Sequence, residues 1–139
     1  METILTEEQS SYIYRISYLS LISFVYALVT KQYTVILVPG SVFLTSIHYW
    51  KRPDYSYRRY LDMFVVKSAL LYQTYMAYGA QYSYEYYTFI CLALSLYPVG
   101  IYYYKKKDYW KSTYAHMGLH IVANIGNIIL YSGYLRHHV

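Results

Sequence analysis

The chain has 139 residues, of which 57% are hydrophobic and 14% are charged. An ordinary soluble domain carries about 25% charged residues, so this composition excludes that class and indicates an integral membrane protein. The formal net charge is +5, but the lysines and arginines gather in two short stretches, so no nucleic-acid partner is expected. The single cysteine, Cys91, excludes an intrachain disulfide bond.

Five segments of mostly apolar residues, each about 17 to 25 residues long, predict five transmembrane helices. Ahead of the first, Thr6 and Gln9 have the spacing of a capping box, and Pro39-Gly40 is expected to kink the second. No linker or internal repeat separates the segments. The sequence therefore predicts one all-α domain over residues 1–139, an integral membrane helical bundle. The expected spans are 11–30, 33–50, 60–78, 86–104 and 113–132.

Positively charged residues concentrate in the loops after the second and fourth spans. The first connection offers only Lys31 and the C-terminal tail only Arg136. Cytoplasmic loops are enriched in lysine and arginine, so we expect a cytoplasmic N-terminus, two cytoplasmic basic loops and a C-terminus on the opposite side. The two basic loops contain Lys51, Arg52, Arg58, Arg59, Lys105, Lys106, Lys107 and Lys111.

Polar residues recur at helical spacing along the last predicted span. His116 and His120 are one turn apart, and Asn124 and Asn127 follow on the same side. Ionisable residues at bilayer depth are costly, and they indicate a functional site with partners elsewhere in the chain.

The predicted topology supplies such partners at the cytoplasmic end of the bundle. His48 ends the second span and Asp62 lies in the first turn of the third, at the depth of His116 and His120. Three histidine ligands with an open fourth position describe a catalytic zinc site. The sequence therefore predicts zinc held by His48, His116 and His120.

The expected chemistry is the activation of water, whose pKa falls to about 7 on such a zinc ion. Asp62 would act as a general base or orient the water, and Ser46 or Thr45 would bind the developing oxyanion. Asn124 and Asn127 would bind a polar group of the substrate. A site at this depth favours a membrane lipid that enters sideways, such as an amide or ester of a fatty acid.

This pattern resembles the CREST superfamily of membrane proteins, which includes the alkaline ceramidases and the progestin and adipoQ receptors. The resemblance rests on a polar residue shortly before His48, on Asp62, and on His116-x-x-x-His120, and it covers about half of the chain. It implies a zinc-dependent, ceramidase-like hydrolase in a shortened form, since the family has seven spans. The family's serine, one turn before the histidine, corresponds here to Leu44, and Ser41, Thr45 or Ser46 would take its place.

Structural explanations for the same residues stay open. His116 and His120 would also fit a hydrogen-bonded interior pair, and Asp62 would fit an intramembrane ion pair with Arg15. Lys67, within the third span, would snorkel or join that network. The asparagines would equally form hydrogen bonds between helices, and Gly118 and Gly126 would permit close packing of helices. His137 and His138, in the tail, are not expected to be ligands.

The second functional class is a non-enzymatic multi-span protein, such as an oligomeric scaffold, a channel or transporter subunit, or a lipid receptor. In a hydrolase the polar residues of spans two, three and five converge within one monomer around a metal. In the alternative they meet across the subunits of a homo-oligomer, or pair through hydrogen bonds. The direction of each polar side chain therefore separates the two classes.

Overall fold

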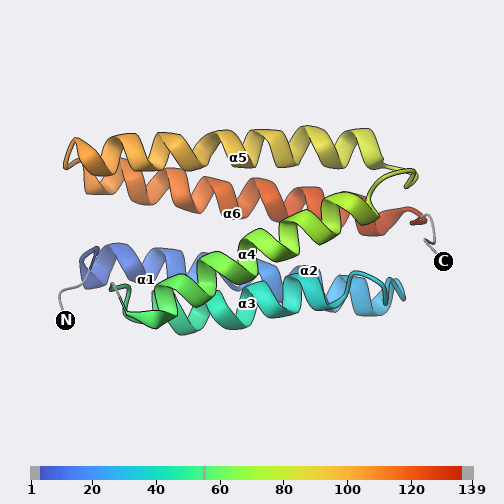
Figure 1. The fold of residues 1–139 in the computed structure, drawn as a ribbon, viewed down its shortest axis with the longest axis horizontal. Helices are drawn as coiled ribbons and strands as arrows, with labels where there is room; N and C mark the ends of the chain where they lie inside the picture. The colour runs from blue at the N-terminus through green and yellow to red at the C-terminus, as the bar shows by residue number, and fades with distance from the viewer. Residues whose placement is uncertain (1–3, 55, 136–139) are drawn as a thin grey trace.

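The computed structural model describes residues 4–54 and 56–135, and every regular element in this part of the chain is a helix (Figure 1). The tail residues Arg136, His137 and His138 lie outside the described residues. The first two helices follow one another as a single rod of 23 residues, so five rods correspond to the five predicted segments. The helices are α1 (Glu7–Ile16), α2 (Leu19–Val29), α3 (Leu37–Trp50), α4 (Tyr57–Met76), α5 (Ser83–Lys105) and α6 (Tyr109–Ser132).

The rods alternate in direction, so the connections gather at two ends. Figure 1 shows the N-terminus, the α3–α4 loop and the α5–α6 loop at one end, and the α2–α3 and α4–α5 connections at the other. Both basic loops therefore lie at the N-terminal end. The backbone of Ile4 joins them there: its amide donates to the Pro53 carbonyl at 2.8 Å, and its carbonyl accepts from the Tyr104 hydroxyl at 3.1 Å.

The start of α1 confirms the predicted capping box. The Thr6 hydroxyl accepts from the Gln9 amide at 3.2 Å, and the Gln9 side chain accepts from the Thr6 amide at 3.1 Å. These two bonds satisfy donors that the first turn of a helix leaves without partners. The helix therefore begins at Glu7, ahead of the apolar segment that begins at residue 11.

The second rod differs from its prediction. α3 begins at Leu37 and has 14 residues, which rise only about 21 Å. Pro39 is the third residue of the helix, so the kink predicted at Pro39-Gly40 falls in the first turn and not within the span. Proline needs no hydrogen-bond acceptor in the first turn, so the helix accommodates it there without breaking.

Two helical stretches are long and apolar enough to cross a membrane, Glu7–Val29 and Ser83–Lys105. α4 and α6 are also long, with 20 and 24 residues. Their polar side chains lower their hydropathy, since α6 carries the predicted polar stripe and α4 contains Asp62, Lys67 and Gln73.

Buried apolar side chains form a cluster at each end of the bundle. The cluster at the N-terminal end contains Leu5, Ile13, Tyr49 and Trp50. The other cluster joins α4, α5 and α6, with Met76, Ala77, Tyr86, Leu130 and Tyr131 among its members. Between them, α5 packs along the length of α6 (Figure 1). Gly126 permits that approach, because a Cβ there would lie 3.1 Å from the Cβ of Phe89.

We predict that Gly126→Ala and Gly100→Ala have different effects on stability. At Gly100 a Cβ would meet its nearest neighbour, the Cβ of Ala115, at an ordinary 3.6 Å. Helix propensity alone should then raise the free energy of unfolding by up to about 1 kcal/mol. Gly126→Ala should gain less or lose stability, because the Phe89 Cβ moves only with the α5 backbone. Unfolding in detergent, followed by circular dichroism, measures both, and equal gains would contradict close packing at Gly126.

Candidate functional site

Ser46 and Asp62 meet between α3 and α4. The Ser46 hydroxyl donates to Oδ1 of Asp62 at 3.2 Å, and the two residues are 1% and 9% exposed. The Thr45 hydroxyl bonds to the carbonyls of its own helix, at Ser41 and Val42. The structure therefore brings together two of the residues predicted to act in catalysis.

His116 and His120 also meet, on successive turns of α6. Their Nε2 atoms are 3.2 Å apart, a hydrogen-bonding distance when one of the two carries the proton. The ring of Trp50 packs against His116, with 4.7 Å between ring centroids. The buried Nε1 of Trp50 has no hydrogen-bond partner in the described part of the chain. The histidine pair therefore lies beside an aromatic wall at the end of α3.

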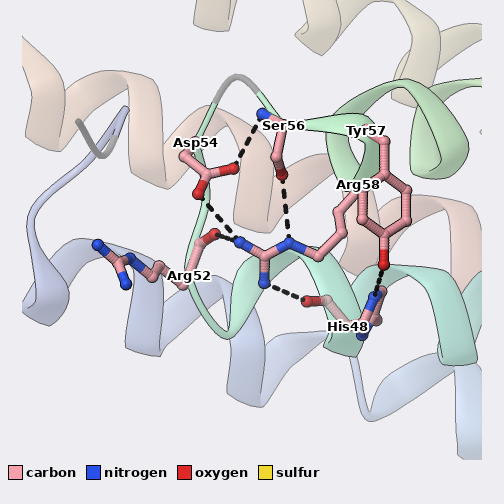
Figure 2. Close-up of polar contacts among 6 residues, drawn as sticks. All are labelled: His48, Arg52, Asp54, Ser56, Tyr57 and Arg58. Atoms are coloured by element: carbon pink, nitrogen blue, oxygen red, sulfur yellow. Dashed lines mark hydrogen bonds and ion pairs between the residues drawn. The ribbon is translucent and has the colours of Figure 1, made fainter. Parts of the chain in front are cut away.

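His48 points elsewhere. It is exposed, and its Nε2 lies 3.5 Å from the hydroxyl of Tyr57 (Figure 2). Within residues 4–54 and 56–135, no three His, Cys, Asp or Glu side chains stand close enough together to hold a metal ion. The arrangement therefore does not fit zinc held by His48, His116 and His120, although the last two are adjacent.

The loop beside His48 is organised around Arg58, as Figure 2 shows. Its guanidinium donates to the carbonyls of Arg52, at 2.9 Å, and His48, at 3.4 Å. It also donates to the Ser56 hydroxyl at 3.2 Å and to the Asp54 carboxylate at 3.0 Å. The last carbonyls of a helix have no partners within the helix, so Arg58 caps the end of α3 and shapes the loop.

The polar stripe of α6 consists of His116, His120, Asn124 and Asn127. Toward the other end of the bundle, its asparagines form hydrogen bonds with other helices. Oδ1 of Asn124 accepts from the Ser23 hydroxyl of α2 at 2.6 Å, and its amide donates to the His120 carbonyl at 2.8 Å. Oδ1 of Asn127 accepts from the Gln73 side chain of α4 at 2.7 Å. Both asparagines therefore have partners within the monomer, as the structural explanation expected.

Gln73 is the centre of this network, and it was not among the residues predicted from the sequence. Its amide donates to Asn127 and, at 3.1 Å, to the hydroxyl of Tyr86, while its carbonyl oxygen accepts from the hydroxyl of Tyr131. Gln73, Tyr86 and Tyr131 are all almost fully buried. A glutamine within a mostly apolar segment was the available signal, but glutamine is neither ionisable nor a usual metal ligand.

The alternative ion pair between Arg15 and Asp62 is not formed among the described residues. Arg15 is exposed, with its guanidinium carbon 5.9 Å from the centre of the Tyr12 ring. Asp62 has the Ser46 hydroxyl as its partner instead. The buried carboxyl group is therefore held by a neutral donor.

We predict that Gln73→Met lowers the free energy of unfolding by about 1 to 2 kcal/mol, because it leaves polar groups of Tyr86, Asn127 and Tyr131 short of partners. Methionine keeps much of the volume, so little of this loss would come from packing. Thr88→Val is the matched control, since the Thr88 hydroxyl bonds only within α5 and is exposed. Denaturant titration in detergent measures both, and equal effects would contradict a central role for Gln73.

The loop carboxylate should give a pH-dependent contribution to stability. Hydrogen bonds from the hydroxyl and backbone amide of Ser56, together with the charge of Arg58, hold the pKa of Asp54 below its usual value. A carboxyl group whose pKa is lower in the folded state stabilises the fold at pH values above its unfolded-state pKa, about 3.9. That stabilisation is lost as the pH falls through the folded-state pKa.

Asp54→Asn should therefore lower the thermal midpoint at about pH 7. The difference from the unmodified chain should shrink as the pH falls below about 4 and through the lower pKa of the folded state. Glu85→Gln, a change at an exposed carboxylate, provides the control. Thermal unfolding across this pH range measures the effect. A difference that stays constant with pH would show that Asp54 acts through something other than its charge.

Comparisons with known proteins find no relative of the chain. No protein-family model, no curated protein and no solved structure matches it. The resemblance to the CREST superfamily therefore stays a prediction.

Proposed function

We propose that the chain is a five-span integral membrane protein, with its N-terminus and both basic loops in the cytoplasm. Three observations support this. Five antiparallel rods place the basic loops at one end. Two of the rods have the length and composition of membrane spans. Large apolar side chains are exposed along the rods, including Ile22, Val29 and Leu71, at 58%, 71% and 74%. A lipid environment would cover such side chains at little cost.

Within that membrane bundle, we propose a non-enzymatic role as a structural subunit of a membrane assembly. The observation that carries this proposal is the direction of the polar side chains. His48 faces Tyr57 and not the histidines of α6, while Asn124 and Asn127 hydrogen-bond to Ser23 and Gln73. Hydrogen bonds between membrane helices hold a bundle together. The polar residues of α6 would then hold the helices together and take no part in a reaction.

A zinc-dependent lipid hydrolase is the second candidate, and one distance favours it. Two nitrogen ligands at 2.0 to 2.1 Å from a tetrahedral zinc ion are about 3.3 Å apart, and the Nε2 atoms of His116 and His120 are 3.2 Å apart. The buried pair of Ser46 and Asp62 offers an acid–base group and a hydroxyl in the same protein. This candidate needs His48 to turn away from Tyr57 toward the α6 pair, or a different third ligand.

Elemental analysis of the purified, untagged protein should separate the two functions. For a structural subunit, we expect the same low zinc content in the unmodified chain and in His120→Ala, because the histidine pair is held by its own hydrogen bond. Ile121→Ala, which changes an exposed side chain of the same helix, provides the control for folding. Near-stoichiometric zinc in the unmodified chain, lost in His120→Ala, would overturn the structural role and justify a screen of ceramides and other acyl lipids.

A further inference from the structure

Lys67 lies at the middle of α4, where a five-span bundle would place it deep in the membrane. It is the eleventh of the 20 residues of the helix, about 15 Å along its axis. The hydrocarbon core is about 30 Å thick, so a position halfway along the span is far from either surface. Lysines near helix ends snorkel to the interface, but a lysine at the middle is costly and indicates a partner.

No partner for Lys67 is present in residues 4–54 and 56–135. Lys67 is exposed, and the ion pairs of this part of the chain join Arg58 to Asp54 and Lys111 to Asp108. The nearest carboxylate in sequence, Asp62, is buried and accepts from Ser46. In the proposed five-span arrangement, the ammonium group would therefore face the membrane without a countercharge from the described residues.

A lateral groove runs beside this lysine, between α3 and α4. Its volume is about 400 Å³. Phe64 and Ser68, which flank Lys67 on its own helix, line the groove together with Leu37, Val38, Ser41 and Ala69. Leu37 and Phe64 are 77% and 70% exposed along its sides, and the Tyr72 hydroxyl closes one end by donating to the Thr34 carbonyl at 2.5 Å. In Figure 1, α4 crosses in front of the other helices.

The groove has the properties of a helix-binding surface in a membrane. Small side chains let helix backbones approach closely, and Ser41, Ser68 and Ala69 supply them here. We propose that the groove and Lys67 bind a transmembrane helix of another protein that carries an aspartate or glutamate near the middle of the membrane. This inference rests on the proposed five-span structure and names the kind of partner that a structural subunit would hold.

Two other possible occupants of the groove do not meet the requirements of charge and depth. In a twofold dimer the same surface meets itself, and two Lys67 side chains at equal depth would repel each other. A lipid phosphate would lie at the membrane surface, far from the middle of α4. Among the described acidic residues, Glu85 and Asp108 lie at helix ends, at the wrong depth, and Asp62 is buried and accepts from Ser46. A carboxylate on a different membrane helix meets the requirement.

The test is energy transfer in phosphatidylcholine vesicles between the labelled full-length chain and a designed polyleucine peptide with one central aspartate. Association should be about tenfold stronger than with the all-leucine peptide, the effect of one strong polar contact between membrane helices. Lys67→Leu should abolish this preference and Lys67→Arg should keep it. Ser68→Phe, which fills the groove, should weaken binding of the aspartate peptide while leaving the charge in place.

Lys51→Leu is the matched control, because it removes an exposed lysine from the end of α3 and not from the middle of α4 beside the groove. It should leave association unchanged. Equal binding of the two peptides, or a preference that survives Lys67→Leu, would overturn the proposed partner.

A separate measurement distinguishes that failure from a failure of the five-span proposal. In a Cys91→Ser background, Lys31→Cys and Lys106→Cys should be labelled by a membrane-impermeant thiol reagent from opposite sides of the vesicle. Labelling of both from one side would overturn the five-span proposal, and with it the assignment of Lys67 to the middle of the membrane.

Discussion

The placement of α4 against α5 and α6 depends on the hydrogen bonds of the Gln73 side-chain amide. Apolar contacts distinguish poorly between a neighbouring helix and a lipid chain, so hydrogen bonds and close packing decide which helices stay together in a membrane. α4 crosses the bundle obliquely (Figure 1), and Gln73 bonds it to α5 through Tyr86 and to α6 through Asn127 and Tyr131. That attachment fixes where α4 leaves α3, and the lateral groove lies on the side where the two helices diverge.

The polar residues of α6 form one stripe in sequence but serve two regions of the bundle. His116 and His120 pair with each other beside Trp50, at the end where the N-terminus and basic loops lie. Asn124 and Asn127 reach α2 and α4, toward the opposite end. A regular spacing on one helix therefore shows which side chains share a face, while the neighbours along that face decide what each of them does.

Much of the fold could be predicted, because it depends on local pattern. The five apolar segments, the capping box at Thr6 and the gathering of basic loops at one end all follow from composition and charge. The direction in which the His48 side chain points could not be predicted. Depth follows from position in a span, but successive helix residues rotate by about 100°, so Ser46 is buried while His48, two residues later, is exposed. Leu44, one turn before His48, is also exposed. A lipid-facing side is apolar like the interior, so hydrophobicity does not mark the buried side of α3.

Because Arg58 is engaged in hydrogen bonds within the α3–α4 loop, it contributes differently from the other basic residues to the charge that the loop presents. A rule based on residue type gives every lysine and arginine the same weight. Here the guanidinium of Arg58 is occupied by two backbone carbonyls, a hydroxyl and a carboxylate, whereas the side chain of Arg52 extends away from this cluster (Figure 2). Attraction of this loop to anionic lipid headgroups would therefore depend mainly on neighbours such as Lys51 and Arg52. Arg58 would thus count toward the proposed orientation while it acts chiefly as a structural cap within the loop.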